Sequence, residues 1–211
     1  MTKNKGFMCL PSGNHDMSRL AGALDEDEIK LAFAFIMSMP GVPFVYYGDE
    51  IGMRYIKGVK SVEGGYTRTG SRTPMQWDNG EVNCGFSEAS PENLYIAIDD
   101  SADRPTVAEQ ISNPNSILNE VKRLIKLRRQ TPALQECSEF ELMSTEQAYP
   151  LIYLRKQGDN KILVLINPND TEYSYNYEKN ISDIIYSVNH IVTIDGTTVK
   201  IPPCSANFIA L

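Results

Sequence analysis

Short apolar runs, polar loops and one apolar helical segment alternate over the first part of the chain. Residues 6–11 and 42–47 are almost uninterrupted in their apolar character. Such runs, without polar alternation, are typical of strands covered on both faces, as in a parallel sheet. Residues 29–39 are apolar nearly all round, which predicts a buried helix. The pattern therefore predicts a β/α/β unit with parallel strands.

Acidic residues mark the start of the first predicted helix. Asp25 suits the N-cap, and Glu28 stands three residues later, where it closes a capping box. The neighbouring acidic side chains also lie near the positive end of the helix dipole. Pro40 and Gly41 predict its end.

Residues 48–112 are rich in glycine and polar residues and show little periodicity, which indicates a long functional loop. Asn113 and Pro114 then predict the start of a second helix, with a cap followed by proline in the first turn. An apolar stripe of helical period follows and ends at Thr131.

Beyond residue 132 the pattern changes to short β-type runs separated by turn signals, among them Asp195-Gly196. The predicted strands cover residues 140–143, 151–155, 162–166, 172–177, 184–191 and 208–211. This pattern is typical of a small antiparallel β-sandwich. We therefore predict two domains, at residues 1–132 and 133–211.

Charge and hydropathy exclude several classes of protein. The formal net charge of −7 argues against binding to nucleic acid, which needs a basic surface. Basic residues gather late in the second helix, and their pattern favours a solvated face that complements the helix dipole. They are Lys122, Arg123, Lys126, Arg128 and Arg129. No apolar run is long enough for a membrane span, and the first residues do not resemble a secretion signal, so we expect a cytoplasmic location.

The chain contains four cysteines and two histidines. The cysteines are widely separated, with no Cys-x-x-Cys pair, so neither a disulfide framework nor a zinc site is expected. We predict that Cys9 and Cys204 are small buried apolar residues. No metal and no cofactor is indicated.

A polar triplet, Asn14-His15-Asp16, directly follows the first predicted strand. A triplet of this kind is more often a turn with an Asx hydrogen bond. Its position favours a site, because β/α folds hold catalytic residues at the carboxyl ends of their strands. An amide, an imidazole and a carboxylate are suited to binding neighbouring hydroxyl groups of a sugar. Contacts to these hydroxyl groups that tighten in a glycosidic transition state lower the barrier of the reaction.

Four segments in this order resemble one known family. They are residues 12–16 with Arg19, residues 40–53, the heptapeptide at residues 72–78 (RTPMQWD), and residues 113–134. They are similar to the later part of the catalytic domain in the alpha-amylase family, glycoside hydrolase family 13, and to its oligo-1,6-glucosidase and alpha-glucosidase branch. The resemblance implies an α/β plus all-β fold. It would hold the last two strands and helices of a (β/α)8 TIM barrel, followed by an antiparallel β-sandwich domain.

The resemblance also assigns roles to single residues. Asp16 matches the carboxylate that stabilises the transition state, and His15 and Asn14 match groups that bind the same sugar ring. Arg19 matches an arginine that lines this end of the pocket, although a loop arginine that only binds carbonyl groups is an equal alternative. Arg72 would reach the sugar from the long loop.

Three further residues are given other roles. Trp77 is expected to anchor the long loop by packing. Asp49 and Glu50 are adjacent in a segment expected to be extended, so their side chains should point to opposite sides. We therefore do not interpret them as an acid/base pair.

The resemblance implies an incomplete active site. Family enzymes use a nucleophilic aspartate and an acid/base glutamate that precede the motif at residues 12–16, and a retaining mechanism needs these two carboxyl groups about 5 Å apart. We therefore expect the chain to contribute to a retaining alpha-glycosidase for alpha-linked glucose oligosaccharides and to be inactive when isolated. The open edge of a partial barrel is expected to associate with itself or with another chain, or to leave the barrel portion partly disordered.

Two alternatives remain open. One is a transglycosylase or isomerase of the same family that acts on trehalose or sucrose. The other is a non-catalytic scaffold of the amylase type. The sugar-binding groups at residues 14–16 favour an enzyme, because a scaffold has no physical need to keep them.

Overall fold

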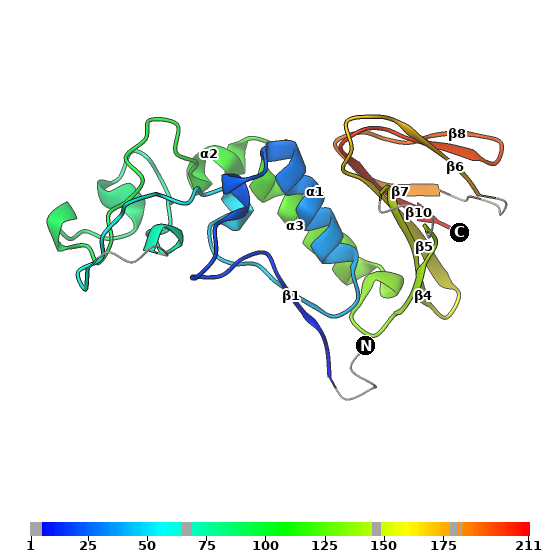
Figure 1. Ribbon diagram of the computed structural model, residues 1–211, viewed down its shortest axis with the longest axis horizontal. Coiled ribbons are helices and arrows are strands. Elements are labelled where there is room, and N and C mark those ends of the chain that lie inside the picture. Colours follow the sequence, from blue (N-terminus) through cyan, green and yellow to red (C-terminus); the bar gives the residue numbers. More distant parts are fainter. Residues whose placement is uncertain (1–5, 65–68, 145–148, 178–180, 182) are drawn as a thin grey trace. The chain divides into compact units, whose positions relative to one another are not determined.

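The computed structural model describes residues 6–64, 69–144, 149–177, 181 and 183–211. Its contacts divide the chain into two compact units, each built from separate segments (Figure 1). The first consists of Met1–Leu10, Lys30–Pro43 and Arg123–Leu211, and the second of Pro11–Ile29 and Phe44–Lys122. The domain boundary near residue 132 stays a prediction.

The first two strands, β1 (Cys9–Pro11) and β2 (Val42–Phe44), form a two-stranded sheet. The backbone N–H of Val42 donates to the carbonyl oxygen of Met8, and that of Ser12 to Phe44, each at 2.8 Å. The bonds advance in the same direction along both segments, which is the parallel order. The parallel pairing predicted from the sequence is therefore confirmed.

The predicted burial of these strands is wrong for several residues. Phe7 and Phe44 are 55% and 54% exposed, and Cys9 is also exposed. The physical reason is that, among the described residues, each strand has only one strand beside it. Cys204 is half-buried, whereas Cys84, in the long loop, is the buried cysteine.

Helix α1 (Glu26–Ser38) begins as the sequence predicts. The N–H of Glu28 donates to Oδ1 of Asp25 at 2.9 Å, and the N–H of Asp25 donates to Oε2 of Glu28 at 2.9 Å. This reciprocal pair is a capping box. The predicted burial of the helix is also confirmed, since Phe33 and Ala34 have no exposed surface.

The long loop contains one helix that the sequence analysis missed, α2 (Val107–Ser112), whose N-cap Thr106 accepts a hydrogen bond from the N–H of Glu109. The next helix, α3 (Ile117–Gln130), begins later than predicted. Ser116 caps it by accepting a hydrogen bond from the N–H of Asn119 at 3.2 Å.

The basic residues of α3 do not all lie on a solvated face. Arg128 is buried, and its guanidinium donates to the carbonyl oxygens of Met37 at 2.7 Å, Met39 at 2.8 Å and Gly41 at 2.6 Å. These carbonyls lie at the end of α1 and in the turn after it. A helix end leaves such carbonyls without partners, and Arg128 supplies the missing donors. Burial lowers the pKa of Arg128.

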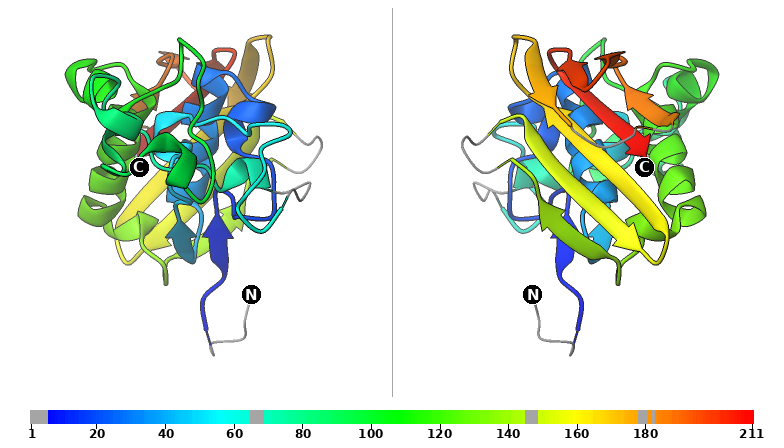
Figure 2. Two further views of the ribbon diagram at one scale, coloured as in Figure 1. Left: turned by 90° about the vertical axis from the view of Figure 1, so that its left-hand side faces the viewer. Right: turned by 90° about the vertical axis from the view of Figure 1, so that its right-hand side faces the viewer.

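The remaining strands form two antiparallel sheets. Their bounds are β3 (Glu139–Leu142), β4 (Leu151–Gln157), β5 (Asn160–Asn167), β6 (Tyr173–Asn176), β7 (Asp183–Val188), β8 (Thr193–Asp195), β9 (Thr198–Ile201) and β10 (Ser205–Ala210). One sheet has the order β3-β4-β5-β10-β7, and the other the order β6-β9-β8. The right-hand view of Figure 2 shows β4 and β5 in yellow and β10 in red within the first sheet.

Both sheets contribute to one hydrophobic cluster. It contains Leu163 and Leu165 of β5 and Val199 and Ile201 of β9, and none of these is exposed. The hairpin of β8 and β9 was missed as a pair of strands, although its turn at Asp195-Gly196 was predicted. The antiparallel character predicted for this part of the chain is confirmed.

Arg128 gives a test of the contacts between the ends of α1 and α3. We expect Arg128→Met to lower the free energy of unfolding by about 3 kcal/mol, because buried carbonyl oxygens would lose charged donors. Arg129→Met is the matched control, since Arg129 is exposed on the same helix. Urea denaturation monitored by circular dichroism measures both. Equal losses in the two variants would contradict a special role for Arg128.

Candidate functional site

Three segments of the second compact unit carry the candidate site. The first is the loop at residues 12–19 after β1, the second is the segment at 46–50 after β2, and the third is the turn Thr69–Ser71 with Arg72 after it. The first two follow the carboxyl ends of parallel strands, where β/α folds place their functional groups. Hydrogen bonds between side chains and backbone carbonyls join all three.

Arg19 is the central residue beneath the site. Its Nη1 donates to the carbonyl oxygen of Tyr47 at 2.6 Å, and its Nη2 to that of Ser71 at 3.0 Å. Nη1 also lies 3.4 Å from Oδ1 of Asp49, and both side chains are fully buried. The guanidinium carbon lies 5.0 Å from the centres of the Tyr46 and Tyr47 rings, within the range of a cation–π contact.

Asp49 is bound from a second side by Ser12. The Ser12 hydroxyl donates to Oδ2 of Asp49 at 2.7 Å and accepts from the N–H of Tyr46 at 2.9 Å. Burial raises the pKa of Asp49, while the Ser12 hydrogen bond and the Arg19 charge act against that rise. This close contact also requires Gly13, because a Cβ there would lie 2.8 Å from Oδ2 of Asp49.

Gly48 allows a second close approach. Its φ of +86° lies in the left-handed region. A Cβ at this position would lie 2.4 Å from Sδ of Met53 and 2.9 Å from Nη1 of Arg19. Only glycine therefore lets the backbone after β2 pass directly over the buried guanidinium.

The buried contacts of Arg19, Asp49 and Ser12 form a support beneath the site. Asp16, His15 and Arg72 lie together above this support. Arg72 Nη2 donates to Oδ1 of Asp16 at 2.7 Å, and Arg72 Nε donates to the carbonyl oxygen of His15 at 3.0 Å. His15 Nε2 lies 3.7 Å from Oδ2 of Asp16. The side chains of His15, Asp16 and Arg72 are 65%, 39% and 34% exposed, so ligands can reach them.

The other two predicted residues lie differently. Asn14 Oδ1 accepts a hydrogen bond from the N–H of Asp16 at 2.8 Å, which is the Asx turn considered as the alternative. Arg19 is buried and binds carbonyl groups of neighbouring loops, as its alternative proposed. The structure therefore brings Asp16, His15 and Arg72 together at the surface and places Asn14 and Arg19 in the support.

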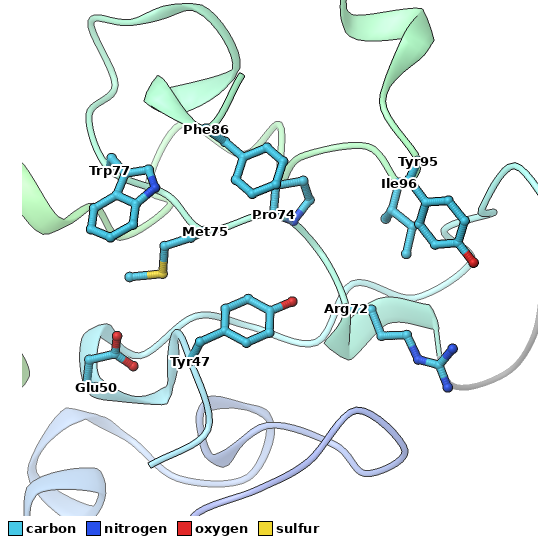
Figure 3. Close-up of a pocket in the computed structure, with 9 residues that line it drawn as sticks. All are labelled: Tyr47, Glu50, Arg72, Pro74, Met75, Trp77, Phe86, Tyr95 and Ile96. Carbon is cyan, nitrogen blue, oxygen red and sulfur yellow. The ribbon is translucent and has the colours of Figure 1, made fainter. Parts of the chain in front are cut away.

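A pocket of about 370 Å³ lies beside Arg72 (Figure 3). Its walls are mainly apolar and aromatic. It is lined by Tyr47, Glu50, Arg72, Pro74, Met75, Trp77, Phe86, Tyr95 and Ile96. The hydroxyl of Tyr47 donates to the carbonyl oxygen of Thr73 at 2.9 Å, which joins the wall to the Arg72 segment.

The sequence analysis missed Glu50 and Trp77 as pocket residues. Burial raises the pKa of Glu50, and its Oε2 atom is buried with no hydrogen-bond partner among the described residues. The extended segment expected at Asp49 and Glu50 is wrong, because both residues lie in a 3₁₀ turn (Asp49–Ile51). A run of two acidic residues after an apolar strand was the available signal.

Within the described residues, no group of three or more histidine, cysteine, aspartate or glutamate side chains could hold a metal ion. Also within them, no helix has the length and apolar character needed to cross a membrane.

Similar solved structures show the same fold. The chain aligns over 98% of its length with the isomaltulose synthase of Erwinia rhapontici NX5, with a TM-score of 0.80 and 23% identity, and covers 43% of that chain. A mutant of MutB in complex with glucose gives a TM-score of 0.82 at 21% identity, again over 98% of this chain and 43% of the other.

Sequence comparisons show the family. The family model described as "Alpha amylase, catalytic domain" matches residues 1–137. The glucan 1,6-alpha-glucosidase of Streptococcus pneumoniae is 28% identical over 85% of this chain and 39% of its own length. The trehalose synthase of Pimelobacter sp. is 37% identical over 71% of this chain and 26% of its own length.

The family model defines the class as glycoside hydrolases, and the similar solved structures give it a TIM-barrel fold. The chain belongs to the alpha-amylase family, glycoside hydrolase family 13, among its alpha-glucosidase-like members. It spans less than half the length of the relatives that it matches.

Arg19 and Arg72 allow a comparison of a buried with an exposed cation. We expect Arg19→Met to lower the free energy of unfolding by roughly 3–5 kcal/mol, because Asp49 would stay buried without its charged partner. Arg72→Met should cost less than about 1 kcal/mol, since its ion pair is exposed to solvent. Urea denaturation followed by near-ultraviolet circular dichroism measures both losses. A smaller loss for Arg19→Met than for Arg72→Met would contradict the supporting role.

The raised pKa of Glu50 predicts that the free energy of unfolding depends on pH. Because burial raises its pKa, the folded chain keeps this proton at a pH where the unfolded chain has lost it. Wild-type stability should therefore fall relative to Glu50→Gln as the pH rises from about 4 toward 7. Urea denaturation at several pH values measures this difference, with Glu92→Gln at an exposed glutamate as the control. A difference that shrinks with rising pH would contradict the direction.

Proposed function

We propose that this chain forms the glucose-binding part of a retaining alpha-glucosidase site. The observation that carries the proposal is the exposed cluster of Asp16, Arg72 and His15 beyond the carboxyl ends of two parallel strands. In the proposal, residues up to about 132 are the last two strands and helices of a TIM barrel. The two antiparallel sheets after them are the C-terminal β-sandwich domain.

Asp16 has the proposed catalytic role. Its carboxylate, whose side chain is 39% exposed, would accept hydrogen bonds from the hydroxyl groups of a bound glucose ring, and these contacts would strengthen as the ring flattens in the transition state. Arg72 holds Asp16 at 2.7 Å and fixes the orientation of its carboxylate. His15 lies on the other side of Asp16 and supplies a second polar group to the same ring.

In the proposal, the nucleophile and the acid/base group of the reaction belong to polypeptide outside these 211 residues. A retaining mechanism needs a nucleophile and an acid/base group about 5 Å apart across the scissile bond. Asp49 does not suit either role, since Ser12 and Arg19 bind it in a fully buried position. We therefore expect the isolated chain of 211 residues not to hydrolyse glycosides.

Transfer to a sugar acceptor is the second candidate function. The similarity to the trehalose synthase of Pimelobacter sp. favours it. Hydrolysis and transfer share the same first step and differ in whether water or a sugar hydroxyl accepts the glucosyl group. Asp16 would have the same role in both.

Replacement of Asp16 tests the proposal. In the longest natural polypeptide that contains this sequence, we expect Asp16→Asn to lower turnover of p-nitrophenyl alpha-glucoside by at least about a hundredfold. Asp100→Asn, at an exposed aspartate outside the cluster, is the matched control. Chromatography of the products from maltose, trehalose and sucrose distinguishes hydrolysis from transfer. Turnover unchanged by Asp16→Asn would contradict the role of Asp16.

A further inference from the structure

One buried serine, Ser71, links the exposed candidate site to its buried support. Its hydroxyl donates to the carbonyl oxygen of His15 at 3.1 Å. Its own carbonyl oxygen accepts hydrogen bonds from Nη2 of Arg19 at 3.0 Å and from the hydroxyl of Tyr46 at 2.9 Å. Ser71 has no exposed surface, so a ligand does not reach its side chain. Any effect of Ser71 on a ligand must therefore pass through the residues that it binds.

The turn Thr69–Ser71 is held on several sides. The hydroxyl of Thr69 donates to the carbonyl oxygen of Val59 at 2.6 Å. Gly70 lies so close to another segment that a Cβ there would be 2.1 Å from the carbonyl oxygen of Ile56. The N–H of Ile56 in turn donates to the carbonyl oxygen of Gly70 at 3.1 Å. The serine at the end of this turn therefore presents its hydroxyl from a fixed backbone.

The His15 carbonyl oxygen has a second donor, Nε of Arg72, at 3.0 Å. The same guanidinium donates through Nη2 to Oδ1 of Asp16 at 2.7 Å. These bonds orient the Asp16 carboxylate only while the loop at His15 keeps its position relative to Arg72. The Arg72 side chain is 34% exposed, so solvent competes for its bonds. The hydroxyl of Ser71 is the buried donor to this carbonyl, and solvent does not compete for it.

We propose that Ser71 is a positioning residue. Its hydroxyl fixes the His15 carbonyl, so that Asp16 meets a bound glucose ring in the orientation that turnover needs. The inference rests on the proposed function of Asp16. Because the contacts of Asp16 would strengthen in the transition state, loss of the Ser71 hydroxyl lowers kcat and leaves KM almost unchanged.

Replacement of Ser71 by alanine tests this inference in the longest natural polypeptide that contains this sequence. Because one neutral hydrogen bond is removed, we expect Ser71→Ala to lower kcat for p-nitrophenyl alpha-glucoside by about fivefold and to change KM by less than about twofold. Ser138→Ala is the matched control and should keep the wild-type kcat. Ser138 is also buried, and its hydroxyl also donates to a backbone carbonyl oxygen, that of Pro132, at 2.8 Å. A wild-type kcat in Ser71→Ala, or equal losses in both variants, would overturn the proposal.

A double-mutant cycle with Asp16→Asn distinguishes positioning from a general loss of structure. If Ser71 acts through Asp16, Ser71→Ala should lower kcat by less than about twofold in the Asp16→Asn background. A merely structural role predicts the same loss, about fivefold, in both backgrounds, and that result would contradict the inference.

A second variant covers the case in which Ser71→Ala does not fold by circular dichroism. Ser71→Cys keeps nearly the same shape, but a thiol is a weak donor. We expect Ser71→Cys to lower kcat about fivefold, as the loss of the hydroxyl does. A wild-type kcat in Ser71→Cys would then show that the hydroxyl is not needed.

The same measurements separate this inference from the proposed function. If Asp16→Asn lowers turnover and Ser71→Ala does not, only the role of Ser71 is wrong. If Asp16→Asn leaves turnover unchanged, the role of Asp16 is wrong, and the role of Ser71 is wrong with it.

Discussion

The arrangement of the candidate site depends on one buried cation, Arg19. Its guanidinium binds the carbonyl oxygens of Tyr47 and Ser71 and lies 3.4 Å from the Asp49 carboxylate. A buried charge is tolerated only where opposite charge and hydrogen-bond acceptors surround it. This requirement fixes three loops relative to one another within the second compact unit. The positions of His15, Asp16 and Arg72 at the surface above these loops therefore depend on the contacts of Arg19.

Within the same loops, some residues form the buried support and others form the exposed candidate site. In the loop after β1, Ser12 and Arg19 point into the support, while His15 and Asp16 stay accessible to solvent. Ser71 and Arg72 both donate to the carbonyl oxygen of His15, at 3.1 Å and 3.0 Å. Such double binding of one carbonyl restricts the loop that carries Asp16. In the proposed function, this restriction would hold the Asp16 carboxylate in place before the transition state forms.

Adjacent acidic residues show how strongly the surroundings decide a role. Asp49 has a serine hydroxyl and a guanidinium as partners, whereas Oε2 of Glu50 has no partner among the described residues and lies in a mainly apolar pocket. Burial raises the pKa of both carboxyls. Ser12 and Arg19 oppose this rise at Asp49, and hydrogen bonds from the backbone N–H groups of Glu50 and Gly48 oppose it at Glu50. Asp49 is thus bound on two sides within the buried support, whereas Glu50 lines the pocket.

Local signals in the sequence determined much of the molecule. The capping box at Asp25 and Glu28, the parallel apolar strands and the antiparallel later sheets depend on short-range patterns, and the family follows from ordered motifs. Tertiary structure alone decided that Arg19 and Arg128 are buried, because their carbonyl partners lie far away in the chain. The pocket also exists only in the tertiary structure, because its walls come from residues 47–50 and from residues 72–96. No pattern of neighbouring residues records such distant contacts, because they arise only when the chain has folded.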